Sequence, residues 1–242
     1  MLLSHRKKFI YTKTVKTAGT SVESYFEKYC MPEGDWTFSH QREEYVSHSG
    51  IVGYRGRQPK GKKWLNHMSA QKIQTGVGID VWNNYFKFCV IRNPYTKLVS
   101  AYHHFIERSQ KPTFKERVIQ QLKKIKTGRT DPADLIQGTT APERFRSWIK
   151  HGGWIDDRDK YFIEGQVCID HFIMQEDLES GVEEVCDILR IPYEPNRLPK
   201  LKKRKAKTKI PLSEYYDRET VDIIHHRYAF EIEKFGYCPP TS

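Results

Sequence analysis

The sequence predicts an α/β fold of three layers, in which helices cover both faces of a central parallel sheet of four or five strands. Strand patterns at 7–15, 85–91 and 171–174 are each followed by a helical pattern, as in strand–helix–strand units. The chain has 242 residues, of which 38% are apolar and 13% aromatic, so it can form a core and is not disordered. We expect one domain over residues 1–242.

The first half of the chain supplies the first two strands. KKFIYTKTV at 7–15 is rich in β-branched and aromatic residues, and a turn and a helical pattern follow it. Residues 31–63 are rich in Gly, Ser and charge without a sustained period, so we expect an irregular excursion that lines a site. A short helix is predicted over 69–76, before the apolar run YFKFCVI at 85–91, which is typical of a buried parallel strand.

The second half of the chain predicts mainly helices. Leu98, Tyr102, Phe105 and Ile106 share one helical face directly after the second strand. The further helices that the spacing predicts lie at 113–126, 142–151, 178–189 and 221–235, with Gly236 as the last stop.

The charge is strongly positive, with 41 Lys and Arg against 30 Asp and Glu and a net charge of +11. This excess favours an anionic partner such as a nucleic acid, a membrane surface, a phosphorylated cofactor or an acidic substrate. Seven bases and no acid lie in KLKKRKAKTK at 200–209. We expect 196–212 to form a basic loop or lid, although a solvated loop and a nucleic-acid or nuclear-localisation patch share this composition.

Targeting signals are not apparent in the sequence. No apolar run approaches the roughly 20 residues of a membrane span, and the beginning MLLSHRKKF has no apolar signal region. The five cysteines have no C-x-x-C spacing, so neither a zinc site nor a full disulfide framework is implied. We therefore expect a cytoplasmic protein that does not contact a membrane.

The turn KTAGTS at 16–21 is the first motif that carries chemistry. A small turn that contains glycine, between a strand and a helix, lets backbone N–H groups close on a phosphate at the helix N-terminus. Lys16 can reach a phosphate oxygen, and Thr17, Thr20 and Ser21 can donate hydroxyl hydrogen bonds. The lysine precedes the glycine, unlike in the common P-loop motif, and an ordinary turn with a capping hydroxyl is the alternative.

The second motif is CVIRNPYTKLVSAYHHF at 89–105. Its buried strand delivers Arg92 to the carboxyl end of the sheet, where open α/β sheets bind ligands. Ser100 follows near the middle of the next helix, and an arginine fork with a hydroxyl can hold a second phosphate. A capping arginine and a solvated serine are plausible singly, but the whole string favours a second anion site.

Together, KTAGTS and FKFCVIRNPYTKLVSAY resemble the two donor-binding motifs of PAPS-dependent sulfotransferases, most closely the carbohydrate-type family 2 branch. The segments at 66–73, 172–191 and 214–237 resemble the catalytic-histidine segment, a late strand and helix, and the C-terminal helix of that branch. The resemblance implies a P-loop-NTPase-like sulfotransferase fold. It also implies transfer of a sulfuryl group from 3′-phosphoadenosine 5′-phosphosulfate (PAPS) to a hydroxyl, or secondarily an amine, with release of 3′,5′-ADP and without a metal.

The resemblance also implies roles for individual residues. Residues 16–21 would hold the 5′-phosphosulfate, with Lys16 on the leaving oxygen, and Arg92 and Ser100 would hold the 3′-phosphate. The chain departs from the family pattern at Lys97, where arginine is common, and in the late loop, where an Asn-x-Ser-like step is common. With the basic residues of the late loop included, the implied donor-binding residues are Lys16, Thr17, Ala18, Gly19, Thr20, Ser21, Arg92, Ser100, Lys202, Lys203 and Arg204.

His67 is the predicted catalytic base, because it lies in the segment that resembles the family's catalytic-histidine segment. Imidazole is also the side chain whose unperturbed pKa is nearest neutrality, which suits the deprotonation of an attacking alcohol. Glu23 is a weaker candidate, and His103 and His104 are expected on a helix surface or in an acceptor cleft. The expected acceptor is a small metabolite or a sugar.

Two other functions are consistent with parts of the sequence. An ATP-dependent small-molecule kinase needs a magnesium-binding acid after a core strand, whereas the strand at 85–91 leads to Arg92. A basic nucleic-acid-binding protein should interleave aromatic and basic residues, whereas the run at 200–209 contains no aromatic residue. Nucleic acid is therefore not the expected partner.

Overall fold

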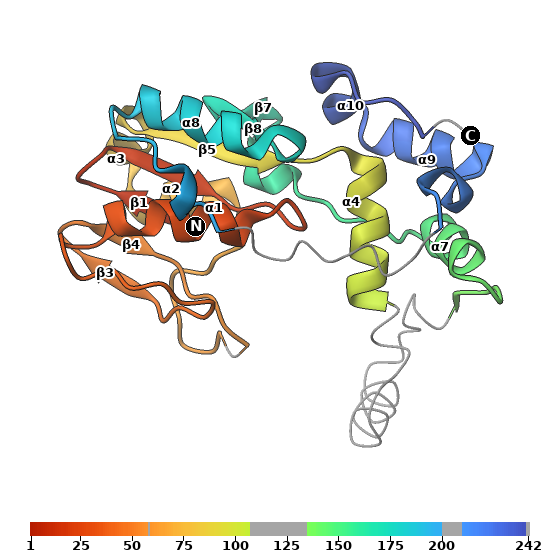
Figure 1. Ribbon diagram of the computed structural model, residues 1–242, viewed down its shortest axis with the longest axis horizontal. Coiled ribbons are helices and arrows are strands. Elements are labelled where there is room, and N and C mark those ends of the chain that lie inside the picture. The colour runs from red at the N-terminus through yellow and green to blue at the C-terminus, as the bar shows by residue number, and fades with distance from the viewer. Residues whose placement is uncertain (58, 107–134, 200–209, 241–242) are drawn as a thin grey trace. The chain divides into compact units, whose positions relative to one another are not determined.

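The structure is a computed structural model and describes residues 1–57, 59–106, 135–199 and 210–240 (Figure 1). The predicted helix at 113–126 and the basic residues Lys202, Lys203 and Arg204 lie outside the described residues.

The chain divides into two compact units. The first comprises Met1–Arg92 with Asp156–Arg204, and the second comprises Asn93–Ile155 with Lys205–Ser242. Each unit is described by itself below. The expectation of a single domain over residues 1–242 stays a prediction.

In the described residues, the first unit contains a mixed sheet of six strands in the order β3-β4-β1-β2-β5-β8, and the α/β prediction is confirmed. The strands β2, β5 and β8 are parallel, with Phe9 opposite Phe86 and Phe88 opposite His171. The strands are β1 (Leu2–Ser4), β2 (Phe9–Thr12), β3 (Tyr45–Ser47), β4 (Gly50–Val52), β5 (Phe86–Ile91) and β8 (His171–Met174), with a separate hairpin of β6 (Phe162–Ile163) and β7 (Gln166–Val167).

The sheet is larger than the four to five parallel strands expected, because β1, β3 and β4 extend it as antiparallel strands. The irregular excursion predicted over 31–63 is wrong where β3 and β4 form. Each of these strands is three residues long, too short for a sustained alternation in the sequence. Gly50 permits the pairing, because a Cβ there would lie 2.1 Å from the carbonyl oxygen of Leu3.

Helices cover both faces of this sheet, so three layers are present. Neighbouring residues of a strand point to opposite faces. Phe9 and Tyr11 pack in the core beside α1 (Gly19–Phe26) and α8 (Leu178–Ile188). Ile10 packs in the opposite core beside α2 (Ala70–Val77) and α3 (Ile79–Asn84).

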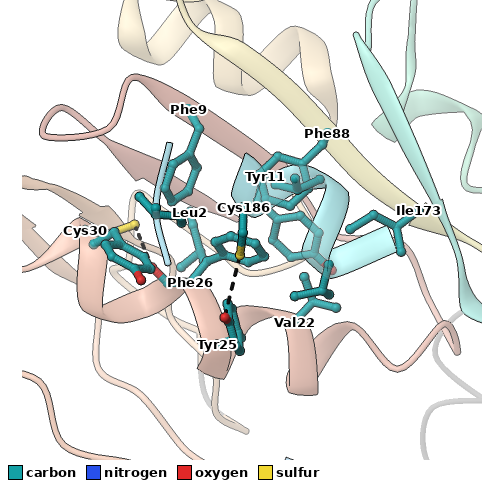
Figure 2. Close-up of a cluster of buried hydrophobic side chains, with 14 of the residues drawn as sticks. Leu2, Phe9, Tyr11, Val22, Tyr25, Phe26, Cys30, Phe88, Ile173 and Cys186 are labelled. Atoms are coloured by element: carbon teal, nitrogen blue, oxygen red, sulfur yellow. Dashed lines mark hydrogen bonds between the residues drawn. The ribbon is translucent and has the colours of Figure 1, made fainter. Parts of the chain in front are cut away.

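The core beneath α1 is rich in aromatic side chains (Figure 2). The Phe26 ring meets the rings of Phe9 and Phe88 edge to face, at centroid distances of 5.7 Å and 5.0 Å. The Tyr25 hydroxyl accepts a hydrogen bond from the Cys186 thiol at 3.6 Å, which ties α1 to α8. These contacts fix α1, which begins inside KTAGTS, onto β2 and β5.

Replacing Gly181 with alanine is expected to destabilise this unit by about 1 kcal/mol or more. The new Cβ would lie 2.7 Å from Cγ2 of Ile173, and overpacking costs about 1–3 kcal/mol. This cost exceeds the gain of up to about 1 kcal/mol from the better helix propensity of alanine. Urea unfolding measures the change, with Glu183→Ala on the exposed side of α8 as the control. A Gly181→Ala protein at least as stable as the parent would contradict this packing.

The described part of the second unit is helical. Its helices are α4 (Pro94–Ala101), a π-helical turn at Tyr102–Ile106, α7 (Ala141–Lys150), a 3₁₀ turn at Leu212–Tyr215, α9 (Arg218–Arg227) and α10 (Ala229–Phe235). The single helix predicted over 221–235 is divided at Tyr228, whose hydroxyl donates to the carbonyl of Ile155 at 2.6 Å. Gly236 ends α10 in the left-handed conformation, as predicted. Within the ranges described, no helix combines the length and apolar character needed to cross a bilayer.

Candidate active site

The KTAGTS turn has an unusual backbone. Lys16 and Ala18 have φ values of 63° and 60°, in the left-handed region that non-glycine residues rarely occupy. Such strain collects at binding and catalytic sites, and left-handed residues in a turn can direct backbone N–H groups into an anion-binding concavity. Lys16, Ala18 and Thr20 are partly exposed, whereas Thr17 is buried. The turn therefore leaves Lys16, Ala18 and Thr20 partly accessible to solvent.

Hydrogen bonds hold this turn against β5 and the segment after Ile155. The Thr14 hydroxyl donates to the carbonyl of Val90 and lies 2.7 Å from the Thr17 hydroxyl oxygen. The backbone N–H of Val15 donates to Oδ2 of Asp157 at 2.8 Å. Because the Thr17 hydroxyl is engaged inside the protein, Thr20 and the backbone N–H groups are better placed for an anion.

Arg92 lies at the end of β5, as the sequence predicts. Its Nη1 donates to the carbonyl of Lys16 at 3.1 Å. The two motifs that are 76 residues apart in the chain are therefore in direct contact. A guanidinium beside the turn adds positive charge at the edge where β2 and β5 both end.

His67 lies just before α2. Its Nδ1 is 3.0 Å from the carbonyl oxygen of Lys13. Because a carbonyl only accepts hydrogen bonds, Nδ1 carries the proton and Nε2 holds the lone pair. This tautomer leaves Nε2 as the atom that can take a proton from a substrate.

The pKa of the His67 imidazole lies below its usual value. Burial of the ring, followed by the charge of Lys13, lowers its pKa from 6.5 to about 4. The residue as a whole is exposed to water, which moderates such a shift, so we expect an ionisation between these two values.

A family model described as "Sulfotransferase family" matches residues 1–238. The chain belongs to the sulfotransferase family. The resemblance to its family 2 branch is thereby confirmed, and the match includes both motifs and His67. Searches of curated proteins and of solved structures each return no significant match.

Glu23 of this sulfotransferase is fully buried and is surrounded by cations. It pairs with Lys13, with Nη1 of Arg55 at 2.8 Å and with the amine of Met1 at 3.4 Å. Burial alone would raise its pKa, but these cations outweigh burial and lower the pKa to about 2. Glu23 is therefore ionised and shielded, which excludes it as the proton acceptor.

Ser100 and the other candidates of the second motif lie in the second unit. Ser100 is partly buried on α4, and the boundary between the units falls directly after Arg92. Nε2 of His103 is 2.7 Å from the Tyr215 hydroxyl, so His103 connects elements of its own unit. The buried Lys97 places its ammonium 5.9 Å from the centre of the Tyr228 ring.

Sequence reasoning missed Asp157, Lys13 and Arg55 of this sulfotransferase. Asp157 accepts a hydrogen bond from the backbone N–H of Val15, which is 142 residues away in the chain. No local sequence pattern distinguishes Asp157 from the other acidic residues. Lys13 and Arg55 are single charges inside apolar or irregular segments, where burial is not visible in the sequence.

Among the described residues, no three His, Cys, Asp or Glu side chains gather as metal ligands would. The prediction of a metal-free reaction stays a prediction.

Proposed function

We propose that this sulfotransferase moves a sulfuryl group from PAPS to a hydroxyl of a small metabolite or a sugar, with an amine as the second choice, and releases 3′,5′-ADP. The observation that carries the proposal is the strained turn at Lys16 and Ala18, with Arg92 bonded to it. His67 supports the proposal, because its Nδ1 donates a hydrogen bond to the carbonyl of Lys13 and its Nε2 can accept a proton from the acceptor hydroxyl.

The proposed donor site consists of two groups of residues. Lys16, the backbone N–H groups of 16–20 and the Thr20 hydroxyl would hold the 5′-phosphosulfate, and Arg92 would bind the 3′-phosphate, for which Ser100 of the second unit stays a prediction from the sequence. The residues fit an anion, because the partly exposed Lys16 lies on a turn of left-handed backbone at a helix N-terminus. Lys202, Lys203 and Arg204 remain candidates for further contacts with the donor.

The proposed reaction is a single displacement at sulfur. Nε2 of His67 takes the proton of the acceptor hydroxyl while the acceptor oxygen forms its bond to sulfur. The bond between sulfur and the bridging phosphate oxygen breaks, and the electron pair stays on that oxygen. The Lys16 ammonium stabilises the resulting negative charge, which is the electrostatic contribution that most lowers such barriers.

A melting assay with nucleotides tests the donor proposal. We expect 3′,5′-ADP to stabilise the protein more than 5′-AMP, ATP or an oligonucleotide, because two separate anion sites recognise it. A ligand at 100 times its Kd adds about 2.7 kcal/mol to stability, which shifts the melting temperature by several degrees. Arg92→Ala should abolish the advantage of 3′,5′-ADP over 5′-AMP, and Arg92→Lys should keep part of it, because lysine lacks the bidentate fork.

The same assay separates the competing functions. Equal shifts from 3′,5′-ADP and 5′-AMP would remove the 3′-phosphate site from the proposal. A larger shift from ATP would favour the kinase, and a larger shift from the oligonucleotide would favour a nucleic-acid-binding protein.

A further inference from the structure

Lys13 lies directly after β2 and connects three parts of the proposed site. Its carbonyl oxygen accepts the Nδ1 proton of His67 at 3.0 Å. Its ammonium pairs with Glu23 on α1 and lies 3.4 Å from the hydroxyl oxygen of Thr20. The residue is 3% exposed, so its side chain runs through the interior. One residue therefore contacts both the proposed base and the helix that begins inside KTAGTS.

The sequence of the turn leaves room for this lysine. A Cβ on Gly19 would lie 3.0 Å from Cγ and 3.1 Å from Cε of Lys13. Any larger residue at position 19 would therefore displace the aliphatic part of the lysine. Lys13 and Glu23 lie on either side of residues 16–21 in the sequence. Their ion pair therefore connects the two ends of this segment, which is called the donor loop below.

Glu23 is anchored independently of Lys13. It also accepts from Nη1 of Arg55 at 2.8 Å, and Arg55 is itself buried. The Arg55 guanidinium donates further to the carbonyls of Ser39 and His40 at 2.8 Å and 2.9 Å. The Glu23 carboxylate is thus held in place by Arg55, and the Lys13 ammonium forms its ion pair with this immobilised group.

We infer that Lys13 is a positioning residue, which holds His67 and the donor loop in one arrangement through its carbonyl and its buried ion pair with Glu23. The inference rests on the proposed function for the role of His67, but the contacts themselves do not depend on the acceptor. Lys13 fixes the Nδ1 tautomer of His67, and its charge opposes protonation of the imidazole.

The charged groups that face His67 determine whether its pKa rises or falls when Lys13 is replaced. Lys13 and the amine of Met1 lower the pKa of His67, and Glu23 raises it. Lys13→Met removes the larger of these two cationic influences, while Glu23 keeps Arg55 and the amine as partners. The pKa of His67 should therefore rise in this variant.

An NMR titration of the imidazole resonances in the full chain tests the inference without donor or acceptor. The His67 signal is assigned by its absence in His67→Ala. We expect Lys13→Met to raise the His67 pKa, because the variant removes a positive charge that disfavours the protonated imidazole. Lys13→Arg keeps the charge and should titrate close to the parent.

Lys87→Met is the matched control. Lys87 is 8% exposed and pairs with Asp170 at 3.0 Å, so its removal also costs a buried lysine and an ion pair. It should leave the His67 titration unchanged.

An unchanged His67 pKa in a folded Lys13→Met protein would overturn the positioning role. If Lys13→Met does not fold, Lys13→Gln is the second variant, and its removal of the same positive charge should raise the His67 pKa; no change there would also overturn the inference. Neither result depends on sulfuryl transfer. Failure of the proposed function would appear instead as full turnover of His67→Ala.

Discussion

Replacing His67 with alanine is expected to reduce turnover roughly 10²–10⁴-fold, the usual contribution of a positioned general base. Donor affinity should remain nearly intact, because Lys16, the turn at 16–21 and Arg92 are proposed to hold the donor. Steady-state rates and 3′,5′-ADP binding are measured on one preparation that melts normally. His151→Ala is the matched control, because His151 is also exposed and its Nδ1 also bonds a backbone carbonyl, that of Ser147 at 2.7 Å.

The dependence of the rate on pH gives a second test of the role of His67. The base form of His67 is the deprotonated one, so the rate of the parent enzyme should rise as pH increases through the His67 pKa. Because burial and Lys13 lower that pKa, the midpoint of the rise should lie below pH 6.5. His67→Ala should lose this limb. Full turnover would refute the base assignment, and lost donor binding would instead assign His67 to the nucleotide site.

Replacing Lys16 with alanine is expected to weaken donor binding and to lower turnover roughly 10²–10³-fold, comparable with the loss of one stabilising group in an oxyanion site. Both quantities fall because a single ammonium binds the donor and stabilises the charge that develops on the leaving oxygen. Isothermal titration with 3′,5′-ADP and single-turnover rates measure them separately.

Lys72→Ala provides the comparison for this change. Lys72 is exposed on α2, so its removal lowers the net charge equally without touching the turn. If Lys16→Ala and Lys72→Ala bind 3′,5′-ADP equally well, Lys16 is not part of the donor site.

The parallel strands were predictable because their apolar runs are continuous. YFKFCVI and HFIM become β5 and β8 within one residue of the predicted limits. The antiparallel extension was not predictable, because β1, β3 and β4 have three residues each and are defined by their partners. The break between α9 and α10 was missed because Tyr228 continues the apolar stripe, whereas its backbone leaves the helical conformation at that position.

The candidate site was predictable where a short motif carries it. Lys16 and Arg92 come from such motifs, and they lie in contact through the carbonyl of Lys16. The residues that support the site come from elsewhere: Asp157 holds Val15, and Lys13 holds His67. Their roles depend on burial and on long-range contacts, which a single sequence does not display.

The pairing of the sheet has a consequence for how the protein acquires its structure. The strands β1 and β2 pair through a tight local turn, as do β3 and β4, so these hairpins can form early. Phe9 pairs with Phe86 and Phe88 with His171, so each parallel partner is roughly 80 residues away, and long loop closures of this kind slow folding. During synthesis, the apolar strand β5 emerges well before β8 can cover its second edge. Mutations that delay this closure should therefore lower the soluble yield of the protein before they lower its final stability.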